Sequence, residues 1–179
     1  DAYNTASEGQ ELAGNISQQA YGLTVTPTWG ADTLKFGLQK IVGNEWFDYV
    51  RDSDAMSLPN KMGSYFNGPN ETSFQVAYTR DGAALMPGLT SLLWYIRGWG
   101  IDGTDYKGGA KGAYTLATSQ DDESHYEVGA YLIYAFQSSK FKGASLAVGS
   151  NWLRTNSTTQ IEGNVEEARV VLNVPLRIF

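Results

Sequence analysis

The chain has 179 residues, a net charge of −6, 20 glycines, 11 tyrosines, 5 tryptophans and no cysteine. Its apolar runs fall well short of the ~20 residues that a membrane-spanning helix requires, so a helical span is excluded. The acidic balance argues against general nucleic-acid binding, which requires a basic surface. The absence of cysteine excludes disulfides and thiol catalysis. This composition fits a membrane protein made of β-strands, because such strands contact lipid with every second residue only.

Seven segments alternate apolar and polar residues at the period of a β-strand. They are residues 21–27, 33–40, 73–80, 89–97, 125–135, 144–155 and 167–179. The segment 89–97 is ambiguous because both of its faces are largely apolar. The pattern predicts an all-β, antiparallel fold.

The connections between these segments alternate between short and long. The long ones are residues 42–72, 98–124 and 156–163, and the short turns are residues 28–32, 81–88 and 137–143. In an antiparallel order the two groups fall at opposite ends of the sheet. Outer-membrane β-barrels have long external loops and short periplasmic turns. We therefore expect residues 1–179 to form part of one transmembrane β-barrel, with a soluble all-β binding module as the alternative.

Several segments resemble the C-terminal portion of OprD-type outer-membrane porins, also called Occ channels. They are Phe47-Asp-Tyr-Val50, Phe66-Asn-Gly-Pro69, Pro87-Gly-Leu-Thr90, Gly100-Ile-Asp-Gly-Thr104 and the ending Val174-Pro-Leu-Arg-Ile-Phe179. The resemblance runs in matching order from Glu8 to Phe179. It implies about seven strands of a monomeric, 18-stranded barrel in a Gram-negative outer membrane. The remaining strands are then expected from an N-terminal half outside this sequence, with a second chain as the alternative.

The resemblance also implies passive, substrate-selective uptake of small polar, carboxylate-bearing solutes, without catalysis, cofactor or metal. In this family, inward-facing arginines guide the solute, because a guanidinium pairs bidentately with a carboxylate. Arg169 matches one position of that column, whereas Ala147 and Gly149 stand at two others. These two small residues predict a wider and less basic wall. A weakly selective general diffusion porin is therefore the alternative function.

The strand period predicts which side chains line the pore. The candidates are Lys35, Gln39, Glu127, Tyr131, Glu167, Arg169 and, at the end of its strand, Arg97. Glu127 and Glu167 are expected to offset the cations or to pair with Arg169. The alternative is that these charges only solvate a water-filled lumen. Arg97 is expected at the lumen mouth, with snorkelling toward lipid headgroups as the alternative.

The long loop 42–72 contains Trp46, Phe47, Tyr65 and Phe66. Aromatic residues in so long a loop predict a packed segment that folds inward. A cap without solute contact is the alternative. The expected partners are small polar or anionic solutes and the lipid and lipopolysaccharide of the outer membrane, and no nucleic acid.

Overall fold

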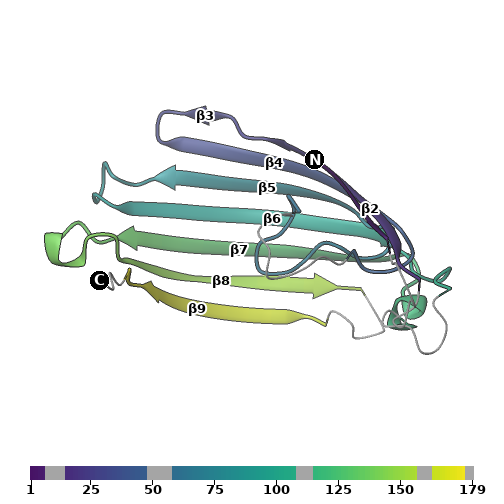
Figure 1. Ribbon diagram of the computed structural model, residues 1–179. Helices are drawn as coiled ribbons and strands as arrows, with labels where there is room; N and C mark the ends of the chain where they lie inside the picture. The colour runs from purple at the N-terminus through teal and green to yellow at the C-terminus, as the bar shows by residue number, and fades with distance from the viewer. Residues whose placement is uncertain (7–14, 48–57, 108–114, 157–162, 176–179) are drawn as a thin grey trace, which may run out of the picture.

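The computed structural model describes residues 1–6, 15–47, 58–107, 115–156 and 163–175 (Figure 1). The strands are β1 (Ala2–Ala6), β2 (Ser17–Val25), β3 (Thr28–Trp29), β4 (Asp32–Val42), β5 (Thr72–Asp81), β6 (Leu89–Ile101), β7 (Glu123–Ala135), β8 (Ser145–Thr155) and β9 (Val165–Asn173). They form one sheet in the order β1-β2-β4-β5-β6-β7-β8-β9, and β3 pairs with β4. Every pairing is antiparallel.

Two short 3₁₀ helices, η1 (Thr115–Ser119) and η2 (Ser139–Phe141), lie in the connections. Within the described ranges, no helix is long and apolar enough to cross a membrane.

The seven predicted strands are confirmed as β2 and β4 to β9. Two strands were not predicted. β1 has five residues and β3 only two, so neither is long enough to show the alternation that identifies a strand. The residues 176–179, predicted as the end of the last strand, lie outside the described part.

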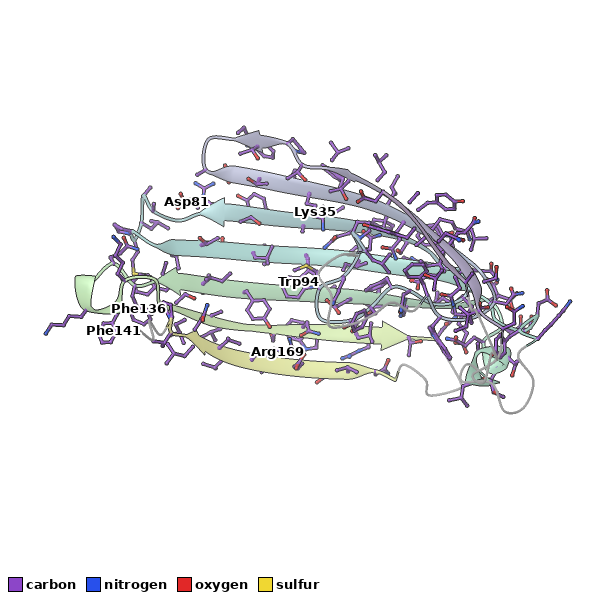
Figure 2. All side chains as sticks on the ribbon, in the orientation of Figure 1. Lys35, Asp81, Trp94, Phe136, Phe141 and Arg169 are labelled. Carbon is purple, nitrogen blue, oxygen red and sulfur yellow. The ribbon has the colours of Figure 1, made fainter. Side chains whose placement is uncertain are left out.

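The connections are sorted between the two ends of the sheet. The turns that follow β3, β5 and β7 lie at one end, at the left of Figure 1, and the longer connections lie at the other. Gly30 and Gly143 have φ angles of 57° and 89° in two of these turns. Residues other than glycine rarely adopt this left-handed backbone conformation. Phe136 and Phe141 lie at the same end, with ring centroids 5.8 Å apart (Figure 2).

The two faces of the sheet have opposite character. We call the face covered by residues 58–71 the inner face and the other the outer face. Large apolar side chains are exposed on the outer face, for example Leu23, Leu38, Leu93, Leu132 and Val170. The inner face buries polar residues, among them Gln39, Gln75, Glu127 and Asn151. A barrel in a membrane places apolar residues outside and polar residues inside, whereas a sandwich core is apolar.

The register resolves the ambiguity of β6. Trp94 and Ile96 are buried on the inner face, with 4% and 0% of their surface exposed, while Leu93 on the outer face is 53% exposed. Trp94 and Ile96 form a small apolar cluster with Phe66, Ala77 and Leu153. A segment that crosses the inner face supplies an apolar side chain to this cluster, which explains why both faces of β6 are apolar.

Gly129 leaves the space that the Trp94 ring occupies. A Cβ atom at Gly129 would lie 2.0 Å from Cζ2 of Trp94. We therefore expect Gly129→Ala to destabilise the folded barrel by about 1–3 kcal/mol, because the ring must shift in a packed site. Urea unfolding of the full-length protein, followed by the heat-modifiable mobility of the barrel on gels, measures this change. Gly163→Ala is the matched control, since its Cβ would meet no atom within 4 Å. Equal unfolding midpoints for the two variants would contradict the prediction.

Candidate pore-lining surface

Residues 58–71 lie across the inner face and are held there by the side chain of Glu127 on β7. Its two carboxylate oxygens accept hydrogen bonds from the backbone N–H groups of Gly63 and Ser64, at 2.9 and 2.6 Å. The indole N–H of Trp94 donates to the same carboxylate. Glu127 is fully buried. A buried carboxylate is stable only when such donors satisfy it, so this contact fixes the position of the segment.

Polar side chains of β4 and β5 bind the first part of the segment. The Asn60 N–H donates to Oε1 of Gln39 at 3.2 Å, and the Asn60 side-chain amide donates to Oγ of Ser73 at 3.0 Å. The Gln39 amide donates in turn to the carbonyl oxygen of Phe66. These residues are buried and make these hydrogen bonds to protein, while Oδ1 of Asn60 has no partner among the described residues.

A buried pair of ionisable side chains fixes the end of the segment. Oε1 of Glu71 lies 2.8 Å from Nε2 of His125 on β7, and Oε2 accepts the Gly68 N–H at 2.8 Å. Gly98 provides the space, because a Cβ there would lie 1.8 Å from Oε1 of Glu71. The Phe66 ring packs against His125 at 4.3 Å between centroids.

The inward-folded segment predicted for the long loop is therefore confirmed for residues 58–71. Residues 48–57 of the same loop lie outside the described residues.

Arg169 remains accessible on the part of the inner face that this segment leaves open. It lies on β9 opposite Gly149 of β8. Its Nε donates to Oε1 of Glu167 at 2.6 Å, and the two side chains are 46% and 34% exposed. Lys35, Trp94 and Arg169 mark the inner face on β4, β6 and β9 (Figure 2). The predicted pairing of Glu167 with Arg169 is present.

Tyr131 lies on the inner face between the buried cluster and Arg169. Its ring stacks on Trp94 with centroids 5.5 Å apart and an interplanar angle of 12°. It also lies over Gly149, where a Cβ would be 2.5 Å from Cδ1 of Tyr131. The prediction of a wider wall at Gly149 is therefore wrong, because the neighbouring aromatic ring fills the space.

Three predicted pore-lining residues hold the segment instead of facing open lumen. Gln39 and Glu127 are 3% and 0% exposed beneath it. Lys35 donates from Nζ to the carbonyl oxygen of Pro59 at 2.7 Å. All three lie on the predicted face, but solute contact by Gln39 and Glu127 is excluded in this arrangement.

Arg97 lies on the outer face, so its predicted place at the lumen mouth is wrong. It pairs with Phe74 on β5 and with Tyr126 on β7, both of which point outward. Because Trp94 and Ile96 point inward, the strand period places Arg97 outward.

Sequence reasoning missed the partners of the segment, namely Asn60, Glu71 and His125. The signal that was available is the set of inner-face glycines Gly37, Gly98, Gly129 and Gly149. At each of these glycines, the side chain of another residue packs directly against the backbone. In the described ranges, no group of three or more metal-ligating side chains comes together.

Replacing Glu127 with alanine should release the segment from the wall. Gly63 and Ser64 lose their acceptors, so we expect their amide hydrogens to exchange at least ~10-fold faster, the equivalent of ~1.4 kcal/mol. Hydrogen exchange of the full-length protein, read by mass spectrometry on peptides that contain residues 58–66, measures this. Glu127→Gln should be intermediate, because it keeps one acceptor oxygen. Glu167→Ala, whose side chain is partly exposed and paired with Arg169, is the control. Unchanged exchange in Glu127→Ala would show that the carboxylate does not hold the segment.

Comparison with known proteins identifies the family. A family model described as outer membrane porin, OprD family, matches residues 1–178. Porin D of Pseudomonas aeruginosa is 33% identical over 187 residues, which cover 99% of this chain and 42% of that protein. The crystal structures of Pseudomonas aeruginosa OccD3 (OpdP) and OprD match with TM-scores of 0.89 and 0.86, at 36% and 34% identity. These matches cover 96% and 99% of this chain, and 43% and 46% of the two structures. The chain thus spans less than half the length of these relatives, and it belongs to the OprD family of outer membrane porins.

Proposed function

We propose that this chain forms part of the wall of a channel for passive, selective uptake of small polar solutes that carry a carboxylate. The observation that carries the proposal is the accessible guanidinium of Arg169 on the inner face. Membership of a porin family supports channel activity and gives no indication of an enzyme.

The geometry around Arg169 supports the preference for carboxylates. A guanidinium has five N–H donors, and Glu167 takes the Nε donor. Tyr131 also hydrogen-bonds to this guanidinium through its side chain, and the donors that remain face the lumen, where they can pair with the two oxygens of a carboxylate. The Tyr131 ring lies over Gly149, which pairs with Arg169 on the next strand. A solute that passes this part of the wall therefore meets the guanidinium of Arg169, which the neighbouring Tyr131 helps to hold in place.

Weak selectivity is the second candidate, because Glu167 neutralises Arg169 at 2.6 Å. The neighbouring inner-face positions on β8, Ala147 and Gly149, carry no charge. If the pair behaves as a neutral unit, the wall favours neither anions nor cations.

The two faces and two ends of the sheet support a proposal for its arrangement in the membrane. We place the long connections outside the cell, the short turns in the periplasm, and the outer face against lipid and lipopolysaccharide. The exposed apolar side chains of the outer face support this orientation of the faces. Strands outside this chain complete a monomeric barrel in this proposal.

Replacing Arg169 with alanine should make the channel more cation-selective. We expect carboxylate flux to fall about threefold to tenfold, because one charge-assisted contact in a wet lumen is lost. Planar-bilayer recording of the full-length protein, with reversal potentials and carboxylate flux, measures both effects.

Two further variants separate charge from geometry. Glu167→Gln should shift selectivity toward anions, because it frees the Arg169 charge. Arg169→Lys should keep the reversal potential but reduce the preference for carboxylate over chloride, since an ammonium cannot pair bidentately. If Arg169→Ala leaves both conductance and carboxylate flux unchanged, the proposal fails and the weakly selective channel is favoured.

A further inference from the structure

Two arginines flank a tyrosine on the outer face, at the end of the sheet that carries the long connections. Arg97 on β6 lies opposite Tyr126 on β7, and Tyr126 lies opposite Arg154 on β8. The outer face elsewhere is largely apolar, with Leu93 and Leu132 exposed. A cation without a partner on a surface of this kind favours an anion from outside the chain.

The structure forms a hollow of about 310 Å³ at this place. Its lining residues are Arg97, Ser124, His125, Tyr126, Arg154, Thr155 and Asn156. Arg97 is exposed and has no hydrogen-bond or ion-pair partner among the described residues. One guanidinium of the site is therefore fully available.

The second guanidinium is held in place at one side. Nη1 of Arg154 donates to the carbonyl oxygen of Leu153 at 2.9 Å, and Nη2 pairs with Glu166. Glu166 is 66% exposed, so this pair is open to competition by another anion. The two arginines and Glu166 together leave one net positive charge beside the hollow.

The position of the hollow along the membrane normal can be estimated from the aromatic residues of the outer face. Tyr126 and Tyr134 are outward-facing aromatic residues at the two ends of β7, eight residues apart. Eight residues span ~27 Å along a strand, and ~20 Å across the membrane at a tilt of about 40°. This approaches the ~25 Å apolar band of such barrels, which aromatic girdles border.

Further aromatic residues lie at the same height as Tyr126. The Phe74 ring lies 5.7 Å from Tyr95 and 6.2 Å from Trp99, and Tyr95 lies 6.1 Å from Tyr126. The hollow therefore lies where the apolar band ends and lipid headgroups begin.

We propose that Arg97 and Arg154 bind the phosphate of an outer-leaflet lipid headgroup in this hollow. A phosphate offers oxygens that two guanidinium groups can pair with bidentately. The polar residues Ser124 and Asn156 line another part of the hollow and suit a polar headgroup. The site rests on the orientation of the barrel in the membrane and is independent of what passes through the pore.

Native mass spectrometry of the full-length protein in detergent tests this site. The protein is titrated with a phosphorylated lipid and with the same lipid lacking its phosphate. We expect Arg97→Ala/Arg154→Ala to weaken binding of the phosphorylated lipid at least ~10-fold, because the loss of even one charged hydrogen bond has this effect and the variant removes both guanidinium groups. Single-channel conductance should not change, because both side chains lie outside the pore. Arg80→Ala is the matched control, since it removes an outward arginine at the short-turn end.

Heat-modifiable gel mobility establishes that each variant is folded. Equal binding by wild type and the folded double variant would overturn the proposal. Equal affinity for the lipid without phosphate would overturn it as well. Inorganic phosphate that binds as tightly as the lipid would show an anion site and would also overturn it. A loss of conductance with retained lipid binding would place Arg97 or Arg154 in the pore and would overturn the proposal.

Discussion

The buried carboxylate of Glu127 is the constraint on which the inner surface depends. Moving an ionised carboxylate out of water costs several kcal/mol unless hydrogen-bond donors replace the lost water. Here two backbone amides and one indole supply them. The requirement is mutual, because the amides of Gly63 and Ser64 are satisfied by the same contact. The segment 58–71 therefore has one position on the wall, and that position decides which inner-face residues a solute can reach.

Two stacked aromatic rings, Trp94 and Tyr131, connect the covered part of the inner face with the open part. We call this pair the aromatic ladder. Trp94 donates to Glu127, lies over Gly129 and stacks on Tyr131, which in turn lies over Gly149 beside Arg169. Glycine is needed at both positions because a Cβ atom would lie 2.0 Å from the Trp94 ring at Gly129 and 2.5 Å from the Tyr131 ring at Gly149. This ladder gives Arg169 a rigid support, and pre-organised donors bind a solute at lower entropic cost than mobile ones.

Alternation alone predicted most of the architecture, because a half-buried strand shows its period directly in the sequence. It placed Glu127, Tyr131 and Arg169 on the correct face. It does not indicate what covers that face, and so Gln39 and Glu127 were expected in open lumen. The assignment of Arg97 failed for a different reason. β6 is apolar on both faces because the infolded segment contributes Phe66 to its inner side, and this contact is long-range. At Gly149 the ring of Tyr131 on the neighbouring strand fills the space. The glycine in the sequence does not indicate that a neighbouring ring lies over it.

Accessibility of single cysteines to a water-soluble thiol reagent measures whether residues 58–71 cover the inner face, and this chain has no cysteine of its own. Three variants report on three environments: Ser73→Cys beneath the segment, Arg169→Cys on the open inner face, and Val170→Cys on the outer face. Ser73 is 1% exposed, whereas the Arg169 side chain is 46% exposed. In intact outer membranes we predict rapid labelling of Arg169→Cys and protection of the other two. Labelling of Ser73→Cys as fast as Arg169→Cys would show that residues 58–71 do not cover the inner face.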